Sequence, residues 1–194
     1  MLKDRYPPAP FDGPLSSRPR NRKEVEKLFG DPTRGGLYMK KADPRWEDRC
    51  LVELHEETAI LPRFGRWYWK HHYLVDPYVR EAFRRSEEVA PGYALIERGT
   101  WAYNFRHMRH KLSMPLSYHS YGICVDINPD DNKAKSLKKR IKPWSPEWLA
   151  IWPTGVTREF VDCWKSCGFS WGGDWFPYAD PMHFEWKGAS KVQV

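Results

Sequence analysis

The sequence of 194 residues lacks any apolar run that approaches the length of a membrane-spanning helix, which is about 20 residues. Its mean hydropathy is −0.76. The first residues, MLKDRYPPAPFDGPLSS, also lack the apolar segment of a Sec signal peptide. We therefore expect no transmembrane segment and synthesis in a cytoplasm without a signal peptide, so that a target outside the cell must be reached by another route.

Cysteine is scarce, with four residues in the whole chain. Cys163 and Cys167 form a single CxxxC pair, whereas zinc knuckles use two CxxC pairs. The sequence thus lacks a structural zinc motif of that type, and we expect the cysteines to be buried thiols. Cys124 is expected to pack within a strand rather than to act as a nucleophile, because nothing else in the sequence indicates a Cys–His dyad.

Positive charge and aromatic side chains are abundant. The chain has 32 Lys and Arg against 25 Asp and Glu, for a net charge of +7, and 15% of its residues are aromatic, including 11 Trp. The charge favours a polyanionic partner, which could be nucleic acid, a membrane surface or an anionic cell-wall polymer. Charge alone does not choose among these. The Trp residues are expected to fill a small core and to line a groove.

Length and composition indicate two unequal parts. The chain is about as long as one ordinary domain. We interpret residues 1–69 as an N-terminal extension, an arm and a short helix packed on the rest, and residues 70–194 as the main domain. The short helix is predicted at Asn21–Phe29, where Asn21 can cap and Gly30 follows as a stop. Residues 31–48 are expected to form a loop.

Three more helices are predicted from caps and apolar stripes. Asp76, as the cap, and Pro77 begin the first. Ser145 precedes the second and Thr157 the third, which Gly168 ends. The first helix is expected to bury Tyr78, Val79, Ala82, Phe83 and Val89. A short strand is predicted at 93–96, and the aromatic, basic run at 64–73 is expected to form core, with His71 and His72 as ordinary histidines.

Two short stretches alternate with the period of a strand. In the first, Ile123, Val125 and Ile127 alternate with Cys124, Asp126 and Asn128. In the second, Phe184 and Trp186 share one face, and His183 and Glu185 share the other. Each stretch therefore has one apolar and one polar face. We expect an α+β fold in which a small antiparallel sheet carries the polar residues and helices pack on one side.

The polar faces supply the ligand types of a catalytic zinc site. Such a site takes three protein ligands of nitrogen or oxygen type and keeps one open position. His119, Asp126 and His183 would supply two imidazoles and one carboxylate. Taken alone, these spacings fit buried, hydrogen-bonded polar residues equally well.

The same stretches offer groups for proton transfer and charge stabilisation. Asp180, three positions before His183, is the expected general base and acid. Glu185 is the second candidate base, or a carboxylate that orients a ligand histidine. A cation is also needed for an anionic intermediate or a substrate carboxylate. Arg106 is the first candidate for this role, and Arg109 is the second.

The two stretches resemble the signatures of one peptidase family. SYHSYGICVDIN is similar to the SxHxxGxAxD signature of the zinc D-Ala-D-Ala carboxypeptidase and L-alanyl-D-glutamate endopeptidase family, the VanY-like peptidases. WGGDWFPYADPMHFEW resembles the GGDW and DxxHFE pattern of its phage endolysin branch. The resemblance covers about residues 70–188 of this sequence. It implies a Zn²⁺ cofactor held by the three ligands above, and it assigns catalysis to Asp180 and Arg106. Ser117 matches the motif serine, which holds the site or contacts the substrate.

The resemblance also implies a function. The carboxypeptidase and dipeptidase branches carry Glu where this chain has Asp180, so that Asp favours the endopeptidase branch. We expect a monomeric endopeptidase that cleaves the stem peptide of peptidoglycan, released through a holin or carried in a virion. The alternatives are a D,D-carboxypeptidase or dipeptidase of the same family, and a non-catalytic wall-binding module. The basic loop 133–142 would contact anionic wall polymers, and no nucleic-acid partner is expected.

Two features depart from the family pattern. Cys124 replaces the small residue of GxAxD, and residues 1–69 have no clear counterpart in the minimal catalytic domain.

Overall fold

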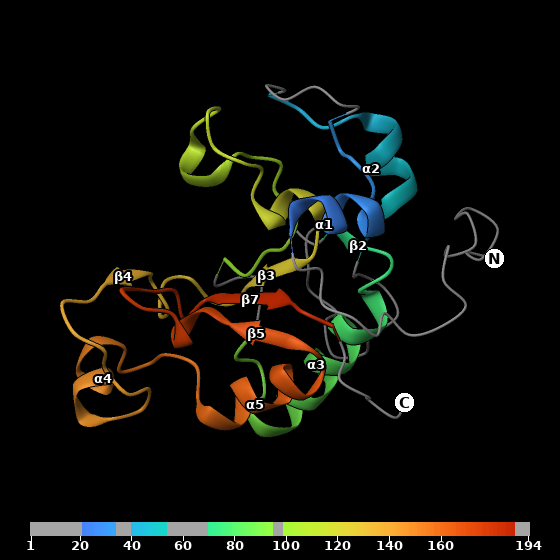
Figure 1. Ribbon diagram of the computed structural model, residues 1–194. Helices are drawn as coiled ribbons and strands as arrows, with labels where there is room; N and C mark the ends of the chain where they lie inside the picture. Colours follow the sequence, from blue (N-terminus) through green and yellow to red (C-terminus); the bar gives the residue numbers. More distant parts are fainter. Residues whose placement is uncertain (1–20, 34–39, 54–69, 95–98, 189–194) are drawn as a thin grey trace.

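A small antiparallel sheet organises the main domain of the protein. The computed structural model describes residues 21–33, 40–53, 70–94 and 99–188. Its central sheet has the order β3 (Cys124–Asp126), β7 (His183–Trp186), β5 (Phe169–Trp171), with both pairs antiparallel. Helices and small sheets surround it (Figure 1). The expected α+β fold is therefore confirmed. In the described part of the chain, no helix is long and apolar enough to cross a bilayer.

The register of β3 and β7 sorts their side chains as the alternation predicts. Cys124 pairs with Glu185, Val125 with Phe184, and Asp126 with His183. Paired residues of an antiparallel ladder point to the same side of the sheet. One face therefore carries the apolar pair Val125 and Phe184, and the opposite face carries the polar residues.

Helices α3 (Asp76–Val89) and α5 (Arg158–Ser166) cover the apolar face. The Phe184 ring lies 5.0 Å from that of Trp164 and 6.1 Å from that of Phe160, both on α5. Aromatic contacts of this kind stabilise a core beyond the area that they bury. Thr157 caps α5 as predicted, because its side chain accepts from the Phe160 N–H.

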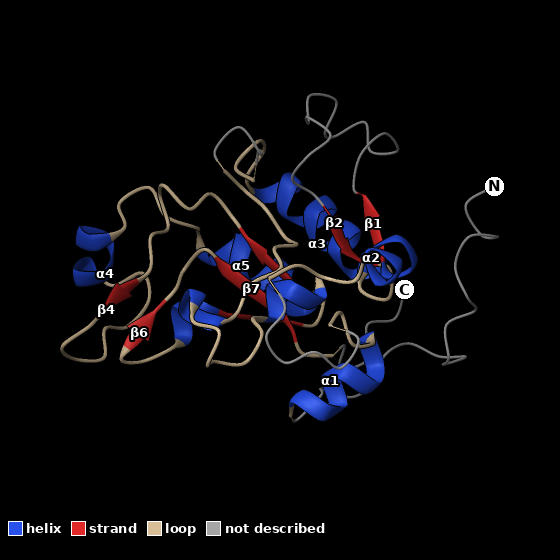
Figure 2. Cartoon of the chain, turned by 90° about the horizontal axis from the view of Figure 1, so that it is seen from above, coloured by secondary structure: helices blue, strands red, loops and turns tan. Residues whose placement is uncertain are grey.

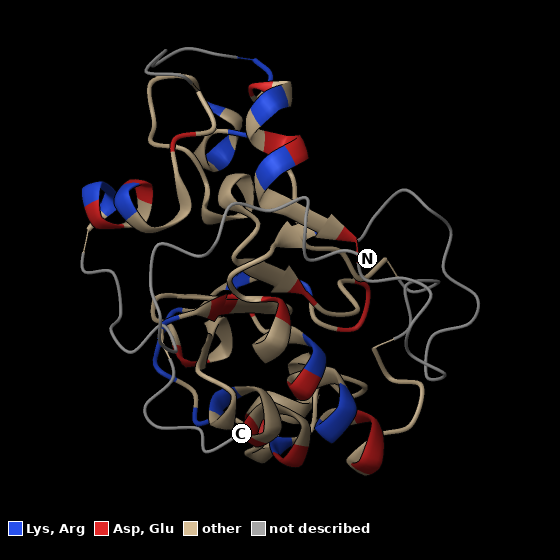
Figure 3. Cartoon of the chain, turned by 90° about the vertical axis from the view of Figure 1, so that its right-hand side faces the viewer, with Lys and Arg blue, Asp and Glu red and all other residues tan. Residues whose placement is uncertain are grey.

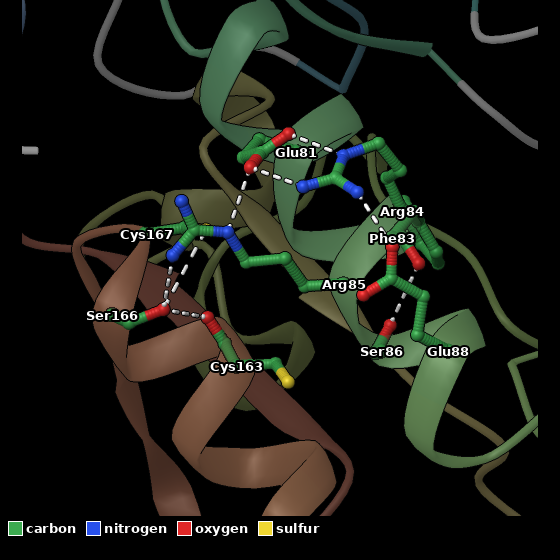
Figure 4. Close-up of polar contacts among 9 residues, drawn as sticks. All are labelled: Glu81, Phe83, Arg84, Arg85, Ser86, Glu88, Cys163, Ser166 and Cys167. Carbon is green, nitrogen blue, oxygen red and sulfur yellow. Dashed lines mark hydrogen bonds and ion pairs between the residues drawn. The ribbon is translucent and has the colours of Figure 1, made fainter. Parts of the chain in front are cut away.

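A charged clamp joins the outer surfaces of α3 and α5 (Figure 4). Arg85 Nε donates to Glu81 Oε1 over 2.7 Å, and Arg85 Nη1 donates to Ser166 Oγ over 3.1 Å. Positive and negative residues are interspersed along the helices (Figure 3). The net positive charge is thus not gathered on these helices.

The N-terminal elements pack on the main domain through two buried aromatic residues. Asn21 caps α1 (Arg22–Phe29), as predicted. Phe29 contacts the ring of Trp186 at 5.9 Å and that of His72 at 4.9 Å. Trp46, on α2 (Pro44–Cys50), donates to the Phe29 carbonyl. The core of α1 is therefore continuous with that of the main domain.

Two small strand pairs lie at opposite ends of the protein (Figure 1, Figure 2). At one end, β1 (Leu51–Glu53) pairs with β2 (Lys70–His72). At the other, β4 (Lys135–Ser136) pairs with β6 (Tyr178–Ala179), near α4 (Pro146–Ile151). Ser145 caps α4, as predicted. His71 and His72 are buried core residues, as expected.

Several local predictions were wrong. Residues 44–48, expected as loop, belong to α2, because Asp43 caps a helix that Pro44 begins. Asp76 is not a cap: its Oδ1 binds His71 Nε2 at 2.7 Å and Arg80 Nε at 2.9 Å from inside the first turn. Val89, at the end of α3, is 47% exposed.

Further differences affect residues near the ends of described segments. Residues 93 and 94 form a turn rather than a strand, and the rest of the strand predicted at 93–96 lies outside the described residues, as does most of the run at 64–73. Of the four cysteines, Cys124 and Cys167 are buried, whereas Cys50 and Cys163 are only half-buried.

Candidate metal centre

A short 3-10 helix, η3 (Tyr118–Tyr121), delivers His119 to the polar face of the sheet. Ser117 precedes η3 and accepts from the His119 N–H at 3.4 Å. Gly122 ends it in the left-handed region, with φ of 67°. A Cβ at this glycine would lie 2.7 Å from the backbone nitrogen of His72. The glycine of the motif is therefore required both for its φ angle and for the close approach of β2.

The ladder between β3 and β7 delivers the other polar residues. Asp126 faces His183 across it, and Cys124 faces Glu185. All four side chains are buried. The backbone of Trp101 pairs with Asp126 on the outer edge of β3. The backbone of Asp126 is thus paired on both sides, with His183 and with Trp101, which fixes the position from which its side chain enters the site.

Three side chains converge on one point. His119 Nε2 lies 3.1 Å from His183 Nδ1 and 3.3 Å from Asp126 Oδ1, and His183 Nδ1 lies 2.9 Å from the same oxygen. Zinc with tetrahedral bonds of about 2.0–2.1 Å separates its nitrogen and oxygen ligands by about 3.3 Å. The spacing of these atoms therefore fits a shared zinc ion. His119 Nδ1 binds the carbonyl of Ala102 at 2.6 Å, which leaves Nε2 free of its proton to act as a ligand.

Cys124 lies beside this group. His119, Cys124 and His183 form a buried candidate metal site whose donor atoms all lie within 4.8 Å of one another. The limit of 4.8 Å for the set with Cys124 is wider than the distances of 2.9–3.3 Å that separate the donor atoms of His119, Asp126 and His183. A thiolate is nevertheless a strong zinc ligand. The sequence prediction assigned Cys124 to packing, and its position next to both histidines was not foreseen.

The electrostatics of the cluster favour a positive charge at its centre. Burial lowers the pKa of His119 and so favours its neutral ring. Burial would raise the pKa of Asp126, but His119 and His183 hold it well below its usual range. Burial would lower the pKa of His183, but Cys124 and Asp126 raise it well above its usual value. A proton on His183, or a metal ion that displaces this proton, would supply the positive charge.

The cluster lies in the wall of a cavity of about 900 Å³, here called the active-site cavity. Trp101 covers one side of His119, with ring centroids 4.3 Å apart. Arg106 lies over the Trp101 ring, with its guanidinium carbon 5.7 Å from the ring centroid. Arg109 and Ser117 line the same cavity. Both predicted arginines are therefore present where a substrate would meet the cluster.

Asp180 also lines the active-site cavity. Its Oδ1 is buried and finds no hydrogen-bond partner among the described residues. Burial, assisted by the charge of Asp126, raises the pKa of Asp180 to about 6, whereas His183 and Arg106 oppose the increase. The predicted general base is therefore a half-buried carboxyl group, with one buried oxygen, whose pKa lies near neutrality.

The first glycine of the GGDW stretch, Gly172, allows Asp180 to approach. Gly172 begins the 3-10 helix η4 (Gly172–Asp174) and accepts from the Asp180 N–H at 2.9 Å. A Cβ at Gly172 would lie 2.4 Å from the Asp180 carbonyl oxygen and 3.2 Å from the Cβ of His183. The turn that carries Asp180 thus rests directly on glycine backbone.

Glu185 lies behind His183 rather than in the centre of the cluster. Its Oε2 is 3.5 Å from His183 Nε2, the nitrogen that points away from Asp126. Its other oxygen is paired with Lys187. The geometry suits the second predicted role, in which Glu185 orients a histidine, better than the role of base.

Besides Cys124, three residues of the site were missed by the sequence reasoning. Trp101 covers His119, and no local motif marks it. Ser120 accepts from the Arg106 N–H at 2.9 Å and donates to the Arg106 carbonyl at 2.8 Å, so that it fixes the segment of Arg106 to η3. Arg22, on α1, reaches the active-site cavity from the N-terminal region. Of the three, only Ser120 could have been suspected from the sequence, because it directly follows the predicted ligand His119.

Comparison with known families agrees with this geometry. A family model described as D-alanyl-D-alanine carboxypeptidase matches residues 111–186. The matched segment includes His119, Cys124, Asp126, Asp180 and His183, and it leaves out Trp101, Arg106 and α1. No solved structure matches the chain significantly.

Proposed function

We propose that this chain is an L-alanyl-D-glutamate endopeptidase of the zinc metallopeptidase family whose model, described as D-alanyl-D-alanine carboxypeptidase, matches residues 111–186. That match supports cleavage of peptides in peptidoglycan. The bond between L-alanine and D-glutamate, and a role as an endolysin or virion-borne lysin of a bacteriophage, belong to the proposal. In that role the protein would reach the wall through a holin or from the virion.

The proposed zinc ligands are His119, Asp126 and His183. Their mutual distances of 2.9–3.3 Å support this choice over one that includes Cys124. Bound zinc would polarise the scissile carbonyl and make a water molecule nucleophilic near neutral pH. Glu185 would keep the His183 ring in place from behind.

The position of Asp180 is the main support for the proposal that the protein is catalytic. Its buried, unpartnered oxygen lines the same cavity as the three ligands. A carboxylate in this position accepts a proton from the attacking water and returns it to the leaving amine. Arg106 would donate to the oxyanion as it forms. A surface ion pair or a structural role would not leave a buried carboxylate oxygen without a partner.

The shape of the site supports internal cleavage of a chain. An endopeptidase must accommodate residues on both sides of the scissile bond, whereas a carboxypeptidase must accommodate only one residue beyond it. The active-site cavity has a volume of about 900 Å³, which leaves room for residues on both sides of the bond. Asp at position 180 also favours the endopeptidase, because the resembling carboxypeptidase and dipeptidase branches carry Glu there.

A second candidate is a D,D-carboxypeptidase or dipeptidase. The family description names that activity, and the arginines of the cavity favour it, because a guanidinium can hold a terminal carboxylate. The two candidates differ in the product that they release, which is terminal D-alanine for the carboxypeptidase and a peptide beginning with D-glutamate for the endopeptidase.

Mass spectrometry of the products from purified peptidoglycan separates the candidates. We expect new amino termini at D-glutamate, and no new products when a chelator is present. Release of free D-alanine would favour the carboxypeptidase instead. If wall material is bound but never cleaved, with zinc present, the protein is a binding module and the proposal is wrong.

A further inference from the structure

A second cavity, here called the side cavity, extends the active-site cavity towards β4 and the basic loop. It has a volume of about 600 Å³ and is lined by Leu137, Arg140, Lys142 and Phe176 among others. Trp175 lines both cavities. The Trp175 ring lies 5.2 Å from that of His183, so that a ligand of the side cavity would end next to the metal centre.

An aromatic ledge, formed by Trp175, Phe176 and Tyr178, runs along these cavities. Their exposed fractions are 40%, 43% and 54%. Among the residues that the structure describes, these are the large aromatic side chains that are exposed, and they lie within four positions of one another. Exposed apolar residues are normally scattered singly over a protein surface. A contiguous group of them marks a binding site.

Hydrogen-bond donors surround the ledge. The guanidinium of Arg140 lies 5.5 Å from the Phe176 ring centroid, a cation–π contact that holds it at the rim. Lys142, which lines the side cavity, is also exposed, and within the described residues it has no ion-pair partner. Lys139, by contrast, is paired with Glu147 at 2.5 Å. The rim therefore offers N–H donors that the protein itself does not satisfy.

We propose that the side cavity and the aromatic ledge bind the glycan strand of peptidoglycan. Aromatic faces stack on the apolar faces of sugar rings, and Arg and Lys donate to sugar hydroxyl and acetamide oxygens. This inference rests on the proposed function. L-alanine is the first residue of the stem peptide, and its nitrogen is linked to a sugar through a lactyl group. The bond after L-alanine therefore lies about two extended residues, roughly 7 Å, from the sugar ring.

The position of the ledge fits this occupant better than an apolar protein partner. The rim is cationic, and the ledge continues directly from the active-site cavity through Trp175. The glycan is covalently attached to the proposed substrate, so that one molecule would fill both cavities. An anionic wall polymer is the alternative occupant, and the experiment below distinguishes it.

Kinetics on matched substrates test the proposal. We expect kcat/KM to be about tenfold higher for a disaccharide-linked stem peptide than for the same peptide without sugar, as stacking on one or two rings would give. Phe176→Leu and Arg140→Gln should each reduce this ratio towards one. Both residues lie outside the active-site cavity, and cleavage of the free peptide should not change. Leu149→Ser, which alters an exposed apolar residue on α4, is the control and should leave the ratio as it is.

Binding without cleavage keeps this inference separate from the proposed function. Calorimetry with a tetramer of N-acetylglucosamine should show binding that Phe176→Leu weakens and Leu149→Ser does not. If the sugar binds in this way but neither peptide is cleaved, the proposed function fails and the glycan site stands. The glycan site is overturned if the substrate ratio survives both variants, or if polyglycerol phosphate binds at the ledge and the sugar does not.

Discussion

His119 Nε2 and His183 Nδ1 lie 3.1 Å apart, although 64 positions separate the two residues in the chain. Two imidazole nitrogens at this distance, facing one carboxylate oxygen, form an electrostatically demanding arrangement in a buried site. A divalent ion relieves it. The register of β3 and β7 places Asp126 opposite His183, and η3 brings His119 to the same two side chains.

Replacement of Asp180 by Asn should abolish catalysis while the metal stays bound. Asn cannot accept the proton of the attacking water, and loss of a general base reduces kcat by about 10²–10⁴-fold. Zinc content and melting temperature should not change, because the substitution keeps the size of the side chain. Asp130→Asn, at a carboxylate whose side chain is 84% exposed, is the matched control. Loss of zinc together with activity in Asp180→Asn would assign this residue to metal binding instead.

Arg22→Gln should weaken substrate binding, since Arg22 lines the active-site cavity. The side chain is half-buried and paired with Glu26 at 2.8 Å, so that it is held in position. We expect KM for a stem peptide with a free glutamate carboxylate to rise about fivefold, or about 1 kcal/mol, with kcat unchanged. The exposed neighbour provides the control Lys23→Gln. An equal rise in KM for the amidated peptide would contradict a contact with the carboxylate.

Gly172→Ala should destabilise the protein and disturb the site together. The new Cβ would lie 2.4 Å from the Asp180 carbonyl, so that the turn carrying Asp180 must shift. Overpacking of this kind costs about 1–3 kcal/mol in the free energy of unfolding. Urea titration measures the loss, and peptide cleavage should decrease by more than stability alone explains. Unchanged values for both would show that the turn can relax at no cost.

Acid should destabilise the packing of α1 through His72. Its Nε2 donates to the Phe29 carbonyl at 3.1 Å, and burial lowers its pKa from 6.5 to about 3. Because the unfolded chain binds this proton more readily, the contribution is complete above a pH of about 6.5 and is lost as pH falls towards 3. At about pH 5 the loss should reach about 2 kcal/mol.

Urea titrations of the wild type and His72→Gln between neutral and acid pH measure this effect. The Gln variant lacks the titrating ring, so that its free energy of unfolding should fall less steeply over the same range. Parallel curves for the two proteins would show that other groups, the metal ligands included, cause the acid sensitivity.

Much of the site could be predicted because its elements follow local rules. Period-two alternation placed His183 and Glu185 on one face of β7, and the structure agrees. The caps Asn21, Ser145 and Thr157 are equally local, since each accepts from an N–H within three positions.

What could not be predicted depends on contacts between distant segments. Arg22 enters the cavity because Phe29 packs against Trp186, a contact across the whole chain. Trp101 covers His119 because its backbone pairs with Asp126. The errors at Asp43 and Asp76 have another cause: the same Asp-Pro sequence begins both helices, but His71 binds the second carboxylate and removes it from capping.

X-ray absorption at the zinc edge tests the metal centre most directly. For the zinc-loaded protein we predict about one ion per chain, with nitrogen and oxygen neighbours at about 2.0–2.1 Å and the outer scattering of two imidazoles. This spectrum should be lost in His119→Ala. A sulfur neighbour at about 2.3 Å would contradict the account by making Cys124 a ligand, and failure to retain zinc would contradict it altogether.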